Sequence, residues 1–593
     1  MSAAAGEGDD LLARRWRWMV LLFWIGAAVW LLWARWGQIH WFALGDTDDN
    51  MRMMQVRGLL TGQNWFDLRQ HRLDPPYGAD IHWSRLVDLP IASIKLLLAP
   101  LLGGAPAEKA AVAIAPLLPL AVVMTALAVI ARRLIAPRAY LLALALLLCA
   151  HSTRGMFVPL RIDHHGWQLA MLSLAALGLT DPRRARGGLI LGLASALSLS
   201  IGLEMLLYLA VAGAITGLIW IFDRSESDRL AAYGASLAGG CAAGYLLFAS
   251  NANRAPVCDA LSPVWLSAMA AAGAVCVVLA FASPRTPLLR LAAGAVGGVI
   301  IAAGFALLWP HCLGRLEGVS PELQRLWLDN VREARPIYVH SWATIFGVLP
   351  LPIAGLAGYG LMIWQRRRDP KALAPWAALG ALALLAASLL LWQTRAGPAA
   401  QLLSIVGATG LGWWLLMRLI GLPQGPLRAL ALAAAFILVS GLGVQNLAKL
   451  IPEKSGGKLQ AVNRANSRCP TLPALRPIAL QPRGYVLTFV DLGPRLITVT
   501  HHDAVAGPYH RNQQAIVDVM RSFRGTPEYA HEVVQRRGVD YVLICPGMSE
   551  STLYASAAPN GFYRQLARGQ VPAWLQPISL PKGSPYRMWR VRR

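Results

Sequence analysis

Apolar runs alternate with short polar segments over most of this chain, and the pattern changes near residue 451. Each run holds about 20 residues, the length that a helix needs to cross roughly 30 Å of hydrocarbon. The pattern therefore predicts a polytopic α-helical membrane protein with about thirteen crossings. The predicted spans lie near 16–36, 108–131, 139–152, 166–180, 187–202, 204–222, 229–249, 263–282, 287–308, 342–364, 375–392, 398–420 and 427–447.

Two apolar segments need separate interpretation. The first span is too long and too rich in tryptophan for a cleavable signal peptide, so we expect a signal anchor. Residues 89–104 are also apolar. Counting them as a crossing would place Arg132 and Arg133 outside and reverse every later loop. We therefore expect them to form a helix in the membrane interface.

Composition and charge agree with a membrane protein. Of the 593 residues, 56% are hydrophobic and 15% charged, and the mean hydropathy is +0.46, which excludes a soluble multidomain enzyme. The net charge of +24 requires no nucleic acid, because much of it lies in clusters that set orientation in the membrane. The clusters that we place in the cytoplasm are Arg14, Arg15 and Arg17; Arg132, Arg133 and Arg138; Arg183, Arg184 and Arg186; and Arg366, Arg367, Arg368 and Lys371.

This topology leaves three polar loops outside, at 37–88, 153–165 and 309–341, together with the tail. We divide the chain into a transmembrane domain at 1–450 and an extracytoplasmic soluble α/β domain at 451–593. The tail pattern predicts short strands at 485–490, 497–500 and 539–544. Helices are predicted at 513–523 and 527–537, the second capped by Thr526 and ended by Gly538.

Cysteines and histidines leave alternatives open. Cys258 and Cys312 fall in outer loops, and Cys469 and Cys545 fall in the tail, so each pair could form a disulfide or remain as free thiols. A tail cluster could hold a metal or ligand or could be structural. It consists of His501, His502, Asp503, His510 and Arg511.

An acidic segment begins the first outer loop, at Asp46, Asp48 and Asp49. Carboxylates beside a bilayer are costly unless they bind something, and a metal or a phosphorylated lipid would satisfy them. Asp48 or Asp49 could instead cap the helix that follows, but capping needs one acid and three are present.

Three further outer segments carry candidate chemistry. Asp163, His164 and His165 end the second loop, and Asp163 and His165 could share one cation, unless the segment is only an interfacial polar belt. Glu333 could be catalytic or could form a surface salt bridge with Arg332 or Arg335. Arg395 lies outside, where orientation rules do not favour a cation, and its fork would suit a lipid phosphate.

In order and topology, these residues resemble the catalytic subunits of oligosaccharyltransferases, in the GT-C superfamily of membrane glycosyltransferases. Asp46, six residues before Arg52, matches the family's first acid. Asp163-His164-His165 falls at its second acidic motif, and Glu333 before Pro336 resembles its late-loop motif. Arg395 falls where the family places an arginine on the donor phosphate.

Two departures accompany the resemblance. His165 stands where many members have an acid. The family's Trp-Trp-Asp motif, which reads the acceptor sequon, is absent after the last span, and the only Trp-Trp pair is Trp413-Trp414. The resemblance therefore implies sugar transfer from a lipid carrier without implying asparagine-linked protein glycosylation.

The implied activity is transfer of a sugar or oligosaccharide from a polyprenyl-(pyro)phosphate donor to a glycan, lipid or protein acceptor at the outer face of a bacterial inner membrane. A divalent cation, Mg²⁺ or Mn²⁺, would be held by Asp46, Asp163 and His165. Asp46 or Glu333 would act on the acceptor, and Arg395 on the phosphate. Secondary candidates are Asp48, Asp49, His164 and Arg52.

Two other functions fit the pattern less well. A transporter or flippase of lipid-linked glycans would carry ionisable groups at the membrane midplane, whereas nearly all predicted spans are free of acids. Glu204 is the main exception, and it could lie at the outer end between two spans, as a partner for an outer arginine. A noncatalytic glycan-binding membrane protein would tolerate His165 and the missing acceptor motif.

Overall fold

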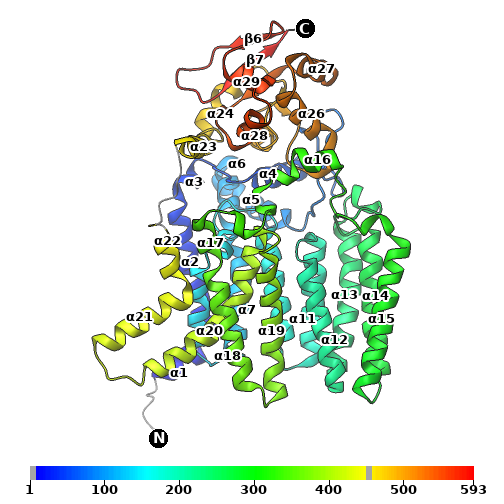
Figure 1. Cartoon of the computed structure of the whole chain (residues 1–593), viewed down its shortest axis with the longest axis vertical. Helices are drawn as coiled ribbons and strands as arrows, with labels where there is room; N and C mark the ends of the chain where they lie inside the picture. The colour runs from blue at the N-terminus through cyan, green and yellow to red at the C-terminus, as the bar shows by residue number, and fades with distance from the viewer. Residues whose placement is uncertain (1–7, 449, 451–456, 593) are drawn as a thin grey trace.

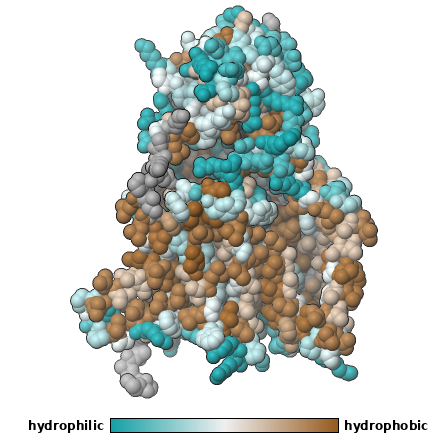
Figure 2. All heavy atoms as spheres, in the orientation of Figure 1, coloured by the Kyte–Doolittle hydropathy of each residue, from teal (hydrophilic) through white to brown (hydrophobic). Residues whose placement is uncertain are grey.

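The structure is a computed structural model that describes residues 8–448, 450 and 457–592. A bundle of long helices forms one part, and the tail lies at one end of the bundle (Figure 1). Hydrophobic residues form a broad band over the bundle, whereas the tail surface is mostly hydrophilic (Figure 2). The predicted fold class, a polytopic helical protein with a sheet-containing C-terminal region, is confirmed.

Each predicted span coincides with at least one helix of the bundle, because apolar side chains cover these segments and small residues allow close packing. For example, a Cβ atom added to Gly234 would lie 2.5 Å from the carbonyl oxygen of Gly273, so α13 and α14 pack backbone to backbone there. The bundle helices are α1 (Gly8–Arg14), α2 (Trp16–Ala34), α7 (Leu117–Leu134), α8 (Ala139–Cys149), α10 (His165–Leu179), α11 (Arg184–Ile201), α12 (Leu206–Phe222), α13 (Ser227–Phe248), α14 (Pro263–Ala282), α15 (Pro287–Leu308), α18 (Pro350–Arg366), α19 (Pro370–Leu389), α20 (Gly397–Leu419), α21 (Pro426–Ser440) and α22 (Leu442–Ala448).

The number of crossings is not confirmed. In the described part of the chain, eight helices are long and apolar enough to cross a membrane, or nine if a bent pair counts as one span. That pair is α21 and α22, which meet at an angle of 72°. Gly441 separates them with a φ of +74°, a left-handed conformation that favours glycine. The last predicted span is therefore broken.

Short elements form the layer between bundle and tail. The apolar segment at 89–104 is helical, and its place in the interface remains a prediction. The elements of this layer are α3 (Trp36–His40), α4 (Thr47–Leu60), β1 (Arg69–Gln70), β2 (Ala79–Asp80), α5 (Asp88–Leu102), α6 (Gly104–Ile114), α9 (His151–Gly155), η2 (Ala252–Arg254), η3 (Pro310–Cys312), α16 (Pro321–Leu326), η4 (Leu328–Asn330), η5 (Arg332–Ala334), η6 (Ile337–Val339), α17 (Trp342–Val348) and η7 (Thr394–Ala396); at the opposite end of the bundle, η1 (Arg224–Glu226) joins α12 to α13.

The tail contains a five-stranded sheet in the order β4-β3-β5-β7-β6. Strands β4, β3 and β5 run parallel to one another. Strand β7 pairs antiparallel with both of its neighbours, β5 and β6. The tail elements are α23 (Gly457–Arg468), α24 (Leu472–Ala479), β3 (Tyr485–Leu487), α25 (Gly493–Val499), β4 (Asp503–Ala504), η8 (His510–Asn512), α26 (Gln513–Arg524), α27 (Pro527–Arg537), β5 (Tyr541–Ile544), α28 (Ser549–Ala557), α29 (Phe562–Ala567), β6 (Leu575–Ile578) and β7 (Arg587–Val591).

Most tail predictions agree with these elements. The predicted helices at 513–523 and 527–537 are confirmed, and Thr526 and Gly538 cap α27 as expected. The predicted strand at 497–500 is wrong, because those residues end α25, where Pro494 at the first turn favours a helix.

The tail shares its hydrophobic core with the outer loops. Met51 and Trp83 of the first loop and Leu323 of the third loop belong to the same buried cluster as Val486 and Phe489. Polar contacts add to this packing: Arg72 binds Asp503 at 3.0 Å, and Arg57 donates to the carbonyl oxygen of Thr498. The tail therefore lies directly over α4. The predicted boundary at 450/451 adjoins residues outside those described, so the two-domain division remains a prediction.

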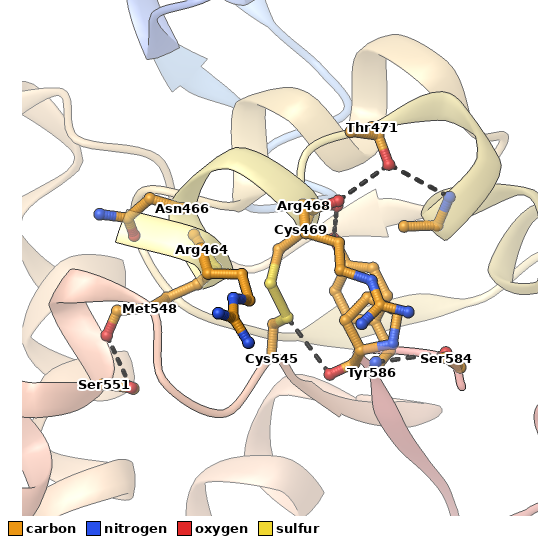
Figure 3. Close-up of a disulfide and its surroundings, with 12 residues drawn as sticks. Arg464, Asn466, Arg468, Cys469, Thr471, Cys545, Met548, Ser551, Ser584 and Tyr586 are labelled. Carbon is orange, nitrogen blue, oxygen red and sulfur yellow. Dashed lines mark hydrogen bonds between the residues drawn. A yellow bond between two sulfur atoms is a disulfide. The ribbon is translucent and has the colours of Figure 1, made fainter. Parts of the chain in front are cut away.

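Both cysteine pairs whose state the sequence left open form disulfides. Cys258 and Cys312 join two outer loops with their Cα atoms 5.4 Å apart. Cys469 and Cys545 join α23 to the end of β5 (Figure 3), with their Cα atoms 6.4 Å apart. Cys149, Cys241 and Cys276 are free thiols, as expected for residues within apolar helices.

Candidate active site

The acidic segment forms the N-terminus of α4. Asp46 is the N-cap residue, and its carboxylate accepts a hydrogen bond from the backbone N–H of Asp48 at 3.3 Å. The alternative in which Asp48 or Asp49 caps the helix is therefore excluded. Asp46 has the extended backbone that an N-cap requires, whereas Asp48 and Asp49 lie inside the first turn.

Asp49 connects this helix to the second outer loop. Its Oδ1 accepts hydrogen bonds from the backbone N–H groups of Ile162, at 2.8 Å, and Asp163, at 3.1 Å. Asp49 is almost fully buried. It therefore sets the position of Asp163 relative to Asp46.

Arg161 lies between the carboxylates. Its guanidinium pairs with Asp46, with Asp163 at 2.7 Å and with Asp49 at 3.5 Å. The structure thus brings together three of the predicted acids, from two outer loops, around one cationic group.

Asp163 and His165 lie side by side. Oδ2 of Asp163 is 3.0 Å from Nδ1 of His165, and both atoms are buried without a hydrogen bond of acceptable geometry. A carboxylate oxygen and an imidazole nitrogen are kinds of atom that bind divalent cations, and here Nη2 of Arg161 lies 2.7 Å from the same Asp163 oxygen. The geometry does not identify the ion.

The acids influence one another's protonation. Burial, together with Asp46 and Asp163, raises the pKa of Asp48 to about 8. Burial also raises the pKa of Asp49, with Asp163 and Asp46 adding to the effect and Arg161 opposing it. Burial alone would raise the pKa of Asp163, but Arg161 and His165 outweigh it and hold that pKa well below its usual range. The site therefore holds more carboxylates than its own cations neutralise.

His164 reaches an acid that the sequence analysis did not assign to the site. Its Nε2 lies 2.8 Å from Oε1 of Glu204, in the break between α11 and α12. Gln168 donates to the other oxygen of Glu204 at 2.7 Å. The available signal was the position of Glu204 at the join of two predicted spans, which places it at a helix end and not at the membrane midplane.

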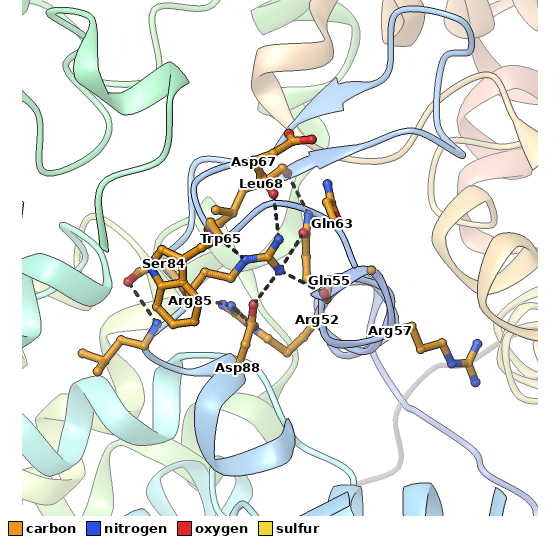
Figure 4. Close-up of polar contacts among 12 residues, drawn as sticks. Arg52, Gln55, Arg57, Gln63, Trp65, Asp67, Leu68, Ser84, Arg85 and Asp88 are labelled. Carbon is orange, nitrogen blue, oxygen red and sulfur yellow. Dashed lines mark hydrogen bonds and ion pairs between the residues drawn. The ribbon is translucent and has the colours of Figure 1, made fainter. Parts of the chain in front are cut away.

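Arg52 occupies a buried network beside the acidic cluster (Figure 4). It donates to Asp88 at 2.8 Å, and Arg85 donates to the other oxygen of Asp88 at 3.1 Å. The guanidinium of Arg52 also lies 4.4 Å from the ring centroid of Trp83. Arg52 thus packs beside the acidic cluster, against Asp88 and Trp83. Among the described contacts it forms no ion pair with Asp46, Asp48, Asp49 or Asp163.

Trp83 of the first outer loop and Tyr509 of the tail form a contact between the site and the tail. The ring of Trp83 packs against His164 at 5.5 Å and edge-on against Tyr509 at 5.6 Å. The Tyr509 hydroxyl donates to the carbonyl oxygen of Thr47 at 3.1 Å. The tail therefore covers the start of α4.

Asp491 is a second acid that the sequence analysis missed. It follows β3, and burial together with the nearby Asp46 raises its pKa to about 6. Glu550 accepts hydrogen bonds from the backbone N–H groups of Val490 and Asp491, each at 2.8 Å. The signal was a lone acid at the carboxyl end of a predicted parallel strand, where ligand sites often lie.

Glu333 and Arg395 lie in two neighbouring short helical turns, η5 and η7, apart from the acidic cluster. Glu333 is exposed in η5, which packs against η7 with Arg395. The carbonyl oxygen of Arg335 accepts two hydrogen bonds from Thr394, each at 2.8 Å, and this holds the turns together. Among the interactions of the described residues, none joins Glu333 to Asp46, Asp48, Asp49 or Asp163. The predicted salt bridge of Glu333 with Arg332 or Arg335 is likewise not among them.

The tail histidines divide between two places. His502 is buried and bonded to the backbone of Gly484 and Ile478, and Asp503 binds Arg72, so these residues are structural. His510 and Arg511 instead bind Asp259.

No protein-family profile and no curated protein sequence matches this chain. Solved structures do. The archaeal oligosaccharyltransferase AglB from Archaeoglobus fulgidus, in complex with an inhibitory peptide and a dolichol-phosphate, matches with 16% identity and a TM-score of 0.65 over 95% of this chain and 73% of that chain. This chain has the fold of the oligosaccharyltransferase.

Two further structures of the Archaeoglobus fulgidus oligosaccharyltransferase agree. The form tethered to an acceptor peptide with an NVT sequon matches with 14% identity and a TM-score of 0.66, over 98% of this chain and 75% of that chain. The complex with Zn and sulfate matches with 15% identity and a TM-score of 0.59, over 93% and 71%. The resemblance to oligosaccharyltransferases expected from the motifs is therefore confirmed at the level of the fold.

Proposed function

We propose that this chain is a membrane glycosyltransferase that moves a sugar or oligosaccharide from a polyprenyl-(pyro)phosphate donor to an acceptor at the extracytoplasmic face. The observation that carries the proposal is the convergence of Asp46, Asp163 and His165 at one end of an oligosaccharyltransferase fold. One structure of that fold is a complex with a dolichol-phosphate and another is a complex with Zn and sulfate, which supports a lipid-phosphate donor and a cation here.

Asp46, Asp163 and His165 would hold a divalent cation, Mg²⁺ or Mn²⁺. When bound, such an ion neutralises charge on a phosphate leaving group. Two carboxylates and one imidazole suit Mn²⁺ and also admit Mg²⁺. Asp49 fixes the loop that carries Asp163, and Arg161 supplies a permanent cation beside the same oxygens.

The chain's other residues have separable roles in this proposal. Asp46 orients the acceptor nucleophile, with Glu333 as the second candidate for accepting its proton. Arg395 is exposed at the start of α20, where its guanidinium can donate to a phosphate from the membrane side. Tyr509 holds the tail over the start of α4, and Asp491 of the tail lies near Asp46.

The orientation in the membrane follows from two observations. The two disulfides lie in the outer loops and the tail, which suits an oxidising compartment. The basic segment in α1 and the α18–α19 connection lie at the opposite end of the bundle (Figure 1), as cytoplasmic clusters should. These observations support an extracytoplasmic tail in a bacterial plasma membrane.

The test is direct transfer. Purified full-length protein is incubated with Mn²⁺ and polyprenyl-phosphate carriers that bear labelled sugars, together with membrane extract as the acceptor source. We expect label to leave the carrier with the wild type. With Asp46→Asn or Asp163→Asn, the rate should fall by about 10³-fold.

Asp80→Asn is the matched control, because Asp80 lies in the same first loop but pairs with the exposed Arg69. It should retain the wild-type rate. Full transfer by both Asp46→Asn and Asp163→Asn would refute the proposed function, as would movement of the intact carrier across the membrane without loss of its sugar.

A further inference from the structure

A second group of metal-ligating side chains lies outside the acidic cluster. His82 follows β2 in the first outer loop, Asp259 lies between α13 and α14, and His510 begins η8 in the tail. One ligand atom from each lies within 4.8 Å of the others. Three segments that are distant in sequence therefore present two imidazoles and one carboxylate to the same point.

His82 is available as a ligand. The hydrogen bonds seen across the described ranges include none to its imidazole, and its ring lies 4.7 Å from that of His510, centroid to centroid. Burial, with His510 adding to the effect, holds the pKa of His82 well below its usual range.

Asp259 is held in place as an anion. Arg511 binds both of its oxygens, through Nε at 2.8 Å and Nη2 at 2.6 Å. His510 lies 2.5 Å from Oδ2. Burial alone would raise the pKa of Asp259, but His510 and Arg511 hold it below its usual range. A carboxylate fixed by an arginine behind it has the outer support that ligands of bound metals usually have.

The charges around the group are balanced. Arg511 opposes a cation here, whereas Asp259 and the nearby Glu204 favour one. The other candidate group, Cys258, His311 and Cys312, has two of its three ligands tied in a disulfide. His82, Asp259 and His510 are therefore the group of the two in which no ligand is tied in a disulfide.

We propose that His82, Asp259 and His510 bind a divalent transition metal ion, with Zn²⁺ as the best-suited ion. Two imidazoles and one carboxylate form the three-ligand set that leaves a fourth tetrahedral position open, whereas Mg²⁺ and Ca²⁺ prefer oxygen ligands. The ion joins the tail to two outer loops and so fixes the tail over the site. This metal site does not depend on the proposed transferase activity.

The experiment measures zinc and not turnover. Full-length protein carrying Asp163→Asn, which weakens the first cluster, is stripped with EDTA in detergent, dialysed, and titrated with Zn²⁺. Bound zinc is counted by mass spectrometry, and the thermal midpoint is recorded with and without the ion. We expect one zinc per chain and a higher midpoint with zinc.

Two substitutions remove ligands in different ways. His82→Ala deletes an imidazole from the first loop, and His510→Gln keeps a side chain that can donate to Asp259 while removing the metal ligand. Each should lose the bound zinc and the zinc-dependent rise in midpoint. His531→Ala is the control, because His531 stacks on Trp574 elsewhere in the tail. It should bind zinc as the background protein does.

Unchanged zinc content in both His82→Ala and His510→Gln would overturn the proposal. Equal loss of zinc in His531→Ala would also overturn it, since the loss would then not be specific to these ligands. His510→Gln guards against a folding artefact, because its midpoint without zinc should remain that of the background protein.

Discussion

Oδ1 of Asp49 accepts a hydrogen bond from the backbone N–H of Asp163 at 3.1 Å, although the two residues are 114 positions apart. This bond fixes the second outer loop on the first turn of α4. Together with Arg161, which pairs with both Asp46 and Asp163, it holds these two carboxylates near each other.

Asp49→Ala should therefore weaken the response of transfer to Mn²⁺ by about 10- to 100-fold, the usual cost of removing outer support from a metal ligand. Asp49→Asn should behave nearly as the wild type, because an amide oxygen still accepts both backbone hydrogen bonds. Measuring the rate against Mn²⁺ concentration checks this, and equal defects in the two variants would contradict it.

Glu550 predicts a pH dependence of tail stability. Burial, together with Asp491, raises its folded pKa from 4.5 to about 8. Between these two pKa values the folded state binds more protons than the unfolded state. The contribution of Glu550 to stability is therefore fully present below pH 4.5 and is lost as the pH rises toward about 8. Thermal denaturation between pH 5 and 8 should show this fall in the wild type and a flatter profile in Glu550→Gln. A midpoint in the wild type that rises across this range would contradict the prediction.

Glu333 and Arg395 test the role of the paired turns. Both side chains are exposed, so Glu333→Gln and Arg395→Ala should leave the thermal midpoint unchanged. If the sequence-based roles hold, Glu333→Gln lowers kcat by about 10²-fold or more, and Arg395→Ala raises the donor KM by about 10-fold. Glu317→Gln, in the same outer loop as Glu333, serves as the control. Wild-type kinetics in Glu333→Gln would remove Glu333 from the catalytic residues.

Asp88 balances two guanidinium groups in a fully buried network (Figure 4). Asp88→Asn leaves Arg52 and Arg85 without their anion and should cost about 3–5 kcal/mol of unfolding free energy. Asp80→Asn breaks a partly exposed pair with Arg69 and should cost less than about 1 kcal/mol. Denaturant titration of both variants gives the comparison, and similar losses would show that burial does not set the cost.

The Cys469–Cys545 disulfide closes a loop with a sequence separation of 76. Its removal in a double serine variant should destabilise the tail by about 4 kcal/mol, since the unfolded chain gains that much loop entropy. Hydrogen exchange of the β3 and β5 amides measures the effect. Cys149→Ser, a free thiol in the bundle, should leave those amides unchanged, and a reductant should reproduce the double variant.

The sequence was sufficient where local pattern decides structure. Apolar run length predicted the helices of the bundle, and Thr526 and Gly538 predicted both ends of α27. It failed at residues 497–500, where β-branched residues suggested a strand. The turn begun by Pro494 and the buried position under the tail make those residues helical.

Part of the candidate site was also predictable from the local sequence. The residue types at 46, 163, 165 and 395 were recognisable because each is costly beside a membrane without a ligand. Glu204 and Asp491 carried only weaker signals, a helix end and a strand end, since each joins the site through a partner from another segment: His164 in one case and Asp46 in the other.

By itself, the sequence determined the membrane class, the outer loops and the kinds of group that could bind a cation and a phosphate, because hydrophobic length and charge act locally. Only the tertiary structure decided which of those groups meet. It joined Asp46, Asp49 and Asp163 through Arg161 and left Glu333 beside Arg395. The reason is physical: hydrogen bonds between distant segments fix such distances, and no spacing along the chain encodes them.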